Sequence, residues 1–135
     1  MEIPKHIDEL EYRIIGVCFE IHSNLGPGFP EEYYQKALEY EFSNSGIVFE
    51  PQKPIQVFYK DIQVGLNFLD FLIEDELILE IKSVSMLDNV HRFQVHKYLA
   101  SSKYYFALLV NFGQDKLLFE KLIPSVKIQN FKNQK

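Results

Sequence analysis

Residues 68–82 read FLDFLIEDELILEIK. Two apolar runs flank the acidic tripeptide 74–76, and this pattern predicts an antiparallel hairpin with a three-residue turn. In that register Asp70 lies directly opposite Glu80, while Glu80 shares one strand face with Lys82 because side chains alternate along a strand. Like charges opposite each other destabilise a hairpin unless water or a cation separates them. The stretch therefore predicts a hairpin that carries a carboxylate pair.

This carboxylate pair has two interpretations. Carboxylate oxygens are preferred ligands of Mg²⁺ and Mn²⁺, so Asp70 and Glu80 would together hold a divalent ion. Lys82 beside that ion would orient a water molecule or stabilise charge on a phosphate. The other interpretation is a solvated strand face with a Glu–Lys neighbour pair, and the hairpin alone does not choose between them.

The sequence around the hairpin predicts a mixed α/β chain. Helical spacing of apolar residues precedes the hairpin, and a strand pair that turns at Lys60-Asp61 leads into it. The sequence after Pro124 is polar and predicts no element. The expected elements are helices over 5–22 and 30–43, strands over 55–59, 62–73 and 77–84, a helix over 89–102, and strands over 104–111 and 117–123.

Length and charge limit the function classes. The 135 residues suit one domain over 1–135, and a net charge of −5 argues against a protein that coats nucleic acid nonspecifically. Residues 1–90 hold 6 basic and 17 acidic residues, a net charge of −11, whereas residues 91–135 hold 8 and 2, a net charge of +6. The basic third is either a face for a polyanion or a solvated tail.

Cysteine usage and hydropathy point to a cytoplasmic protein that does not enter a membrane. The only cysteine, Cys18, excludes an intramolecular disulfide, and its apolar surroundings predict burial. The N-terminus lacks the pattern of a signal peptide, and no stretch approaches the roughly 20 apolar residues of a membrane-spanning helix.

Two further motifs lie outside the hairpin. Gly28, Glu31 and Tyr34 form the pattern G-x-x-E-x-x-Y at the start of the second helix. His91, Gln94 and Tyr98 follow at i, i+3 and i+7, which places them on one face of the third helix.

Together with the hairpin, these motifs resemble the GxxExxY proteins, a compact branch of the PD-(D/E)xK nuclease-like superfamily. The similarity spans about residues 5–123 and includes Leu25-Gly26-Pro27-Gly28 and Asn111-Phe112-Gly113. It implies an α/β fold with a mixed sheet and a restriction-endonuclease-like core of order α-β-β-β-α-β. An extra N-terminal helix and a C-terminal strand would complete the chain.

The resemblance also implies a role for each motif residue. Asp70, Glu80 and the main-chain carbonyl of Ile81 would bind Mg²⁺ or Mn²⁺, and Glu31 would reach the ion directly or through water. Lys82 would be the catalytic lysine. Gln94, Tyr98 and His91 would line the same cleft and contact the substrate, with Gln94 also counted in the catalytic set. Many relatives carry a basic residue where this chain has Phe68, which would weaken one phosphate contact.

Two functions follow as expectations. The first is a metal-dependent nuclease that hydrolyses phosphodiester bonds of DNA or RNA, with the basic third attracting phosphates. The alternative is a non-catalytic module that keeps the nuclease-like fold and binds nucleic acid or another protein. Either protein could form a homodimer that contacts both sides of a duplex.

Overall fold

The computed structural model describes residues 1–134, and it contains four helices and five strands within that range. The first eight elements follow the predicted order, so the mixed α/β class is confirmed. In chain order the elements are α1 (Lys5–Leu25), α2 (Glu31–Ser45), β1 (Phe49–Tyr59), β2 (Ile62–Ile73), β3 (Leu77–Lys82), α3 (Asn89–Ser101), β4 (Phe106–Asn111), β5 (Leu118–Leu122) and α4 (Val126–Asn133).

The five strands form one sheet in the order β1-β2-β3-β4-β5. Only β3 and β4 are parallel, and α3 provides the crossover between them, whereas the other neighbours are antiparallel. Because parallel strands end at the same edge, Lys82 and Asn111 pair at the carboxyl ends of β3 and β4. The arrangement is consistent with a restriction-endonuclease-like fold.

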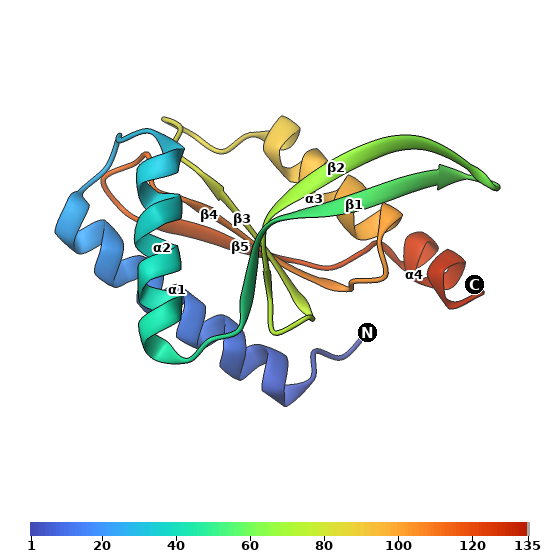
Figure 1. Ribbon diagram of the computed structural model, residues 1–135, viewed down its shortest axis with the longest axis horizontal. Coiled ribbons are helices and arrows are strands. Elements are labelled where there is room, and N and C mark those ends of the chain that lie inside the picture. Colours follow the sequence, from blue (N-terminus) through green and yellow to red (C-terminus); the bar gives the residue numbers. More distant parts are fainter. Residues whose placement is uncertain (135) are drawn as a thin grey trace.

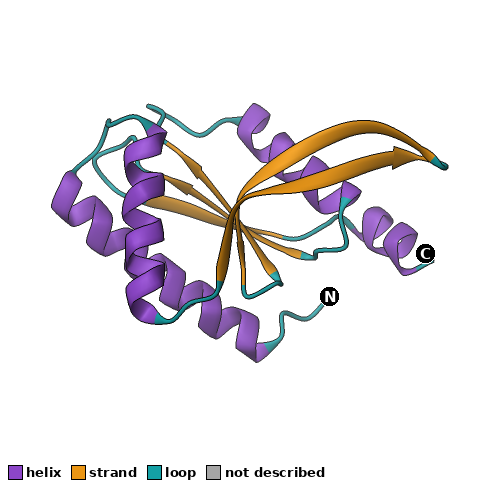
Figure 2. Cartoon of the chain, in the orientation of Figure 1, coloured by secondary structure: helices purple, strands orange, loops and turns teal. Residues whose placement is uncertain are grey.

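Helices cover both faces of the sheet (Figure 2). One core lies between α1, α2 and one sheet face, and it includes the fully buried Cys18, as predicted. The second core lies between α3 and the opposite face, where Ile78 packs against the helix. Both faces of β3 are therefore covered, which explains why Leu77–Ile81 is buried throughout although Glu80 interrupts its apolar run.

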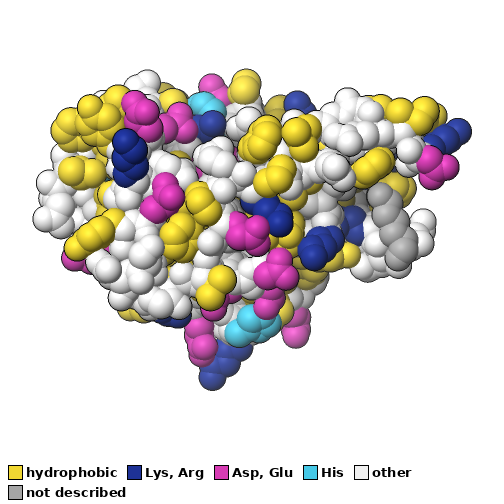
Figure 3. All heavy atoms as spheres, in the orientation of Figure 1, with side chains coloured by type: hydrophobic (Ala, Val, Ile, Leu, Met, Phe, Trp, Pro, Cys, Tyr) yellow, Lys and Arg dark blue, Asp and Glu magenta, His cyan; other side chains and the backbone are white. Residues whose placement is uncertain are grey.

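A two-stranded arm projects from the sheet (Figure 1). Strands β1 and β2 pair along their whole length to Tyr59 and Ile62, but β2 pairs with β3 only over Phe71–Ile73. Hydrophobic side chains show along the arm, with charged side chains at its tip (Figure 3). Strand β1 begins six residues earlier than predicted. It lies at the edge of the sheet, and an edge strand tolerates prolines such as Pro51 and Pro54, which break the alternating pattern.

Helix α4 corrects the prediction that the sequence after Pro124 forms no element. The side chain of Ser125 caps it by accepting a hydrogen bond from the N–H of Ile128 at 3.3 Å. Lys132 then donates to the carbonyls of Leu99 and Tyr104, which joins α4 to the end of α3. The helix contains no buried residue, so no apolar stripe could have revealed it. Within residues 1–134, no helix has the length and hydropathy needed to cross a membrane.

Candidate functional site

Asp70 and Glu80 lie where the sheet divides. The ladder between β2 and β3 ends at the pair Phe71–Leu79, and the next opposite residues are Asp70 and Glu80, as the hairpin register predicted. The N–H of Asp70 donates to Oε1 of Glu80 at 2.8 Å, and the N–H of Ile81 donates to Oδ2 of Asp70 at 2.9 Å. The two carboxyl groups thus satisfy backbone groups that lose ladder partners as the strands separate.

Burial and mutual repulsion favour the protonated forms of this carboxyl pair. Burial raises the pKa of Glu80 to about 9, and the neighbouring charge of Asp70 acts in the same direction. The pKa of Asp70 is raised by burial as well, although the N–H of Ile81 opposes the shift. The interaction between the two side chains raises the pKa of Glu80 and lowers that of Asp70. At neutral pH a shared proton relieves the repulsion that a metal ion would otherwise relieve.

Lys82 and Glu31 lie close to the pair. The ammonium of Lys82 lowers the pKa of Asp70 and of Glu80, and Glu80 and Lys82 share a strand face. Partial burial raises the pKa of Glu31, the first residue of α2, and the charges of Lys82, Asp70 and His91 act on it as well. In the described part of the chain, however, no three Asp, Glu, His or Cys side chains gather closely enough to hold a metal ion.

Helix α3 brings Gln94 and Tyr98 to the same place. Burial raises the pKa of Tyr98 to about 12, and the charges of Glu80 and Asp70 add to the shift. The side chain of Gln94 lowers the pKa of Tyr98, so the two side chains lie next to each other. Tyr98 therefore lies near the carboxyl pair, and Gln94 lies beside Tyr98 on the helix face that the sequence predicted.

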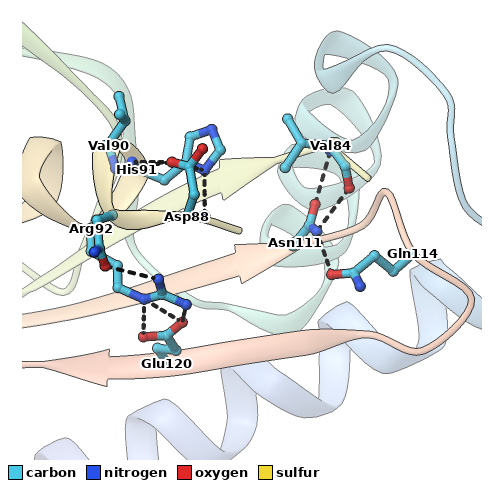
Figure 4. Close-up of polar contacts among 9 residues, drawn as sticks. Val84, Asp88, Val90, His91, Arg92, Asn111, Gln114 and Glu120 are labelled. Atoms are coloured by element: carbon cyan, nitrogen blue, oxygen red, sulfur yellow. Dashed lines mark hydrogen bonds and ion pairs between the residues drawn. The ribbon is translucent and has the colours of Figure 1, made fainter. Parts of the chain in front are cut away.

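His91 has a structural role that the motif did not reveal. Its Nδ1 accepts a hydrogen bond from the N–H of Asp88 at 3.1 Å, while Asp88 accepts from the N–H of Val90 at 2.9 Å (Figure 4). The two residues form a capping box at the start of α3. One nitrogen of His91 is engaged in this way.

Gln52 joins the site without any signal in the sequence. The ladder between β1 and β2 pairs Pro51 with Phe71 and Lys53 with Leu69, and it skips Gln52 opposite Asp70. The backbone of Gln52 has a φ of 51°, which is unfavourable for a residue with a side chain. Its side-chain amide favours the charged form of Asp70 and so lowers the pKa of that group. Only the register of β1 against β2 identifies this contact.

The motif Asn111-Phe112-Gly113 clamps the backbone that follows Lys82. The buried Asn111 accepts from the N–H of Val84 at 3.0 Å through Oδ1 and donates to the carbonyl of Val84 at 2.9 Å through Nδ2 (Figure 4). The N–H of Phe112 donates to the carbonyl of Lys82 at 2.8 Å. A Cβ at Gly113 would lie 2.2 Å from the carbonyl oxygen of Val84, so only glycine fits there.

The motif Gly-x-x-Glu-x-x-Tyr shapes the loop before α2. Gly28 has a φ of +88°, which suits glycine. The hydroxyl of the fully buried Tyr34 donates to the carbonyl of Gly26 at 2.6 Å and accepts from the N–H of Phe29 at 3.1 Å. Ser83, directly after Lys82, donates to the carbonyl of Phe29 at 2.5 Å. This loop is therefore attached to the backbone beside Lys82.

Part of the basic C-terminal third is paired within the fold. The guanidinium of Arg92 on α3 binds the carboxylate of Glu120 on β5, with an Nη2–Oε2 distance of 2.7 Å (Figure 4). Lys121 lies 4.0 Å from the buried carboxylate of Glu11. These side chains join helices to β5, a use that the charge distribution alone did not predict.

We call the place where β2 and β3 separate, at Asp70 and Glu80, the fork of the sheet. The oxygen atoms gathered at this fork suit a hard divalent cation. Asp70 and Glu80 supply carboxylate oxygens, and the carbonyl of Ile81 belongs to the same strand end. Mg²⁺ and Mn²⁺ prefer such oxygen ligands, and a buried pair of carboxyl groups that holds a proton is a site where a cation can replace that proton.

Comparison with known proteins identifies a superfamily for this chain. Neither the curated proteins nor the solved structures include a match to the chain. A family model described as the PD-(D/E)XK nuclease superfamily matches residues 8–122. That match covers α1 from residue 8 onward, α2, all five strands and α3, and it includes Asp70, Glu80 and Lys82. The chain belongs to the PD-(D/E)XK nuclease superfamily.

Proposed function

We propose that this protein is a divalent-metal-dependent nuclease of the GxxExxY type that hydrolyses phosphodiester bonds of DNA or RNA. The observation that carries the proposal is the half-buried to buried pair Asp70 and Glu80, held at the fork of the sheet beside Lys82. Membership of the superfamily suggests nuclease activity. The attachment of Tyr34 to the loop around Gly28 gives the GxxExxY pattern a structural purpose and supports the narrower assignment.

The proposed metal ligands are Asp70, Glu80 and the carbonyl of Ile81, with Glu31 acting through a water molecule. When bound, a divalent ion supplies an activated water and stabilises negative charge on the phosphate. Lys82 holds a positive charge beside the carboxyl pair, where it attracts a phosphate oxygen.

The remaining site residues orient these groups. Gln94 and Tyr98 are linked to each other on α3 and face the carboxyl pair, where they contact the substrate. His91 lies at the start of the same helix and adds a further polar contact. Asn111 keeps the backbone after Lys82 in one conformation, so the lysine enters the site from a fixed position.

A non-catalytic module is the second candidate, and one observation favours it. The protein has a net charge of −5. In its basic C-terminal third, Arg92 and Lys121 form ion pairs within the fold. Such a protein attracts polyanions weakly. It would keep the fold and serve as a subunit that binds nucleic acid or another protein.

Calorimetric titration with Mn²⁺ tests the proposal. The wild type should bind the ion, and Asp70→Asn and Glu80→Gln should each abolish binding. Glu32→Gln is the control, because Glu32 lies beside Glu31 on α2 and should leave binding unchanged. The same proteins are then incubated with DNA and with RNA in Mg²⁺ or Mn²⁺, and cleavage should follow metal binding.

Two results would contradict the proposal. A wild type that binds no Mn²⁺, even with an oligonucleotide present, would favour the non-catalytic module. Divalent-dependent cleavage that persists in both Asp70→Asn and Glu80→Gln would place the active site elsewhere.

A further inference from the structure

Two exposed aromatic rings stack on each other beside the proposed site. Phe29 and Tyr33 have ring centroids 5.5 Å apart and an interplanar angle of 17°. Phe29 is 40% exposed and Tyr33 is 50% exposed. Stacked side chains of this size usually contribute to a core, so an exposed pair is a surface available to a ligand.

The position of the pair relates it to the carboxyl groups. Phe29 and Tyr33 flank Glu31 in the sequence, and Glu31 senses the charges of Lys82 and Asp70. The carbonyl of Phe29 accepts a hydrogen bond from Ser83, the residue that follows Lys82. The aromatic pair therefore borders the place where the proposed function puts the scissile phosphate.

Both backbone groups of Phe29 are held in place. Its N–H is bound by the hydroxyl of Tyr34 and its carbonyl by the hydroxyl of Ser83. Tyr34 is itself fully buried and stacks on Phe112 with centroids 4.4 Å apart. The ring of Phe29 thus projects from an anchored loop, and an anchored aromatic surface binds a flat ligand with little loss of conformational entropy.

The surrounding charges indicate which part of a nucleotide meets these rings. Glu31 and Glu32 lie between Phe29 and Tyr33 in the sequence, and their negative charge repels phosphates. The positive charge of the site lies at Lys82 instead. A nucleotide therefore directs its phosphate toward Lys82 and its base toward the rings. Bases stack on aromatic side chains only when they are unpaired, since those of a duplex are stacked within the helix.

We propose that Phe29 and Tyr33 form a stacking platform for an unpaired base next to the scissile phosphate. The substrate is then single-stranded DNA or RNA, or an unpaired segment of either. This inference rests on the proposed nuclease function and narrows its substrate.

Binding measurements that do not depend on cleavage test the platform. Fluorescence anisotropy gives the affinity for fluorescein-labelled single strands of DNA and of RNA, and for the matching duplexes, with Ca²⁺ in place of Mg²⁺. Phe29→Leu and Tyr33→Leu retain apolar bulk and remove the aromatic face. Each should weaken single-strand binding roughly 5- to 150-fold, the range expected for the loss of one base–aromatic contact. Duplex binding should change little.

Conservative and control variants separate stacking from structure. Phe29→Tyr and Tyr33→Phe keep an aromatic face and should retain single-strand affinity. Tyr12→Leu is the matched control, because Tyr12 is 81% exposed on α1 and lies on a different helix. Thermal denaturation should show the same Tm for the leucine variants as for the wild type, since both rings are exposed.

The outcomes also separate this inference from the proposed nuclease function. Unchanged single-strand affinity in both leucine variants would overturn the stacking platform. If those variants still bound Mn²⁺ and cleaved nucleic acid, the proposed nuclease function would remain supported. Equal losses for single strands and duplexes would likewise overturn it, because a stacking surface discriminates between them. A wild type that binds Mn²⁺ but neither single strand would reject an unpaired base as the ligand of the aromatic pair.

Discussion

The N–H of Asp70 donates to Oε1 of Glu80 across a 2.8 Å hydrogen bond, at the first position where β2 and β3 no longer pair. The charge of Asp70 also raises the pKa of Glu80 beyond the effect of burial. One pair thus closes the open end of the ladder and concentrates acidic oxygens there. Ionising Glu80 in this place costs free energy, so the pH dependence of the free energy of unfolding measures the interaction of the pair.

In metal-free buffer the protein should lose stability as pH rises. Glu80 has a pKa of about 9 in the folded protein and an ordinary value near 4.5 when unfolded, so the folded state retains its proton longer. The stabilisation is complete below about pH 4.5 and is lost as pH rises through about 9, with a slope of at most about 1.4 kcal/mol per pH unit. Urea denaturation in EDTA across this window measures the slope. Glu80→Gln should flatten the profile, and equal slopes in the two proteins would contradict the protonated pair.

Gly113→Ala should destabilise the protein strongly. The added Cβ would lie 2.2 Å from the carbonyl oxygen and 2.3 Å from the nitrogen of Val84, and a backbone held by Asn111 cannot move aside cheaply. We expect a loss of about 2–3 kcal/mol in the free energy of unfolding. Gly16→Ala is the control, because a Cβ there meets no atom within 4 Å and alanine favours the interior of α1. That variant should gain about 0.5–1 kcal/mol.

Gln52→Gly separates the backbone of Gln52 from its amide. Glycine adopts a φ of 51° without strain, so the free energy of unfolding should stay within about 1 kcal/mol of the wild type. The variant loses the amide that favours the charged form of Asp70, and its Mn²⁺ affinity should fall about 10- to 100-fold. Calorimetry measures the affinity, and Gln56→Gly on the same strand should leave it unchanged. If Gln52→Gly binds Mn²⁺ as tightly as the wild type, the amide has no part in holding Asp70.

Cys18 should be inert in the folded protein and reactive after unfolding. Its side chain is fully buried, and burial raises the pKa of the thiol to about 12, so almost no thiolate exists at neutral pH. Mass spectrometry after iodoacetamide treatment should show no modification in native buffer and one adduct in urea. Rapid alkylation under native conditions would mean that α1 opens locally.

The sequence alone was sufficient for the features that depend on neighbouring residues. The turn at 74–76 joins two strands of period two, so the register that opposes Asp70 to Glu80 follows from counting along the chain. The order of the first eight elements and the burial of Cys18 also followed from the sequence, because apolar periodicity is a local property. The motif spacing identified the superfamily for the same reason.

Other features exist only because distant segments meet. Gln52 reaches Asp70 because the ladder of β1 skips one residue, and Asn111 holds Val84 because β3 and β4 are parallel neighbours. Helix α4 was missed since it packs through Lys132 and buries no residue of its own. The sequence therefore determined the order of elements and the opposed carboxyl groups. Tertiary structure decided which side chains surround those groups, because long-range strand register and helix docking depend on contacts that no local pattern encodes.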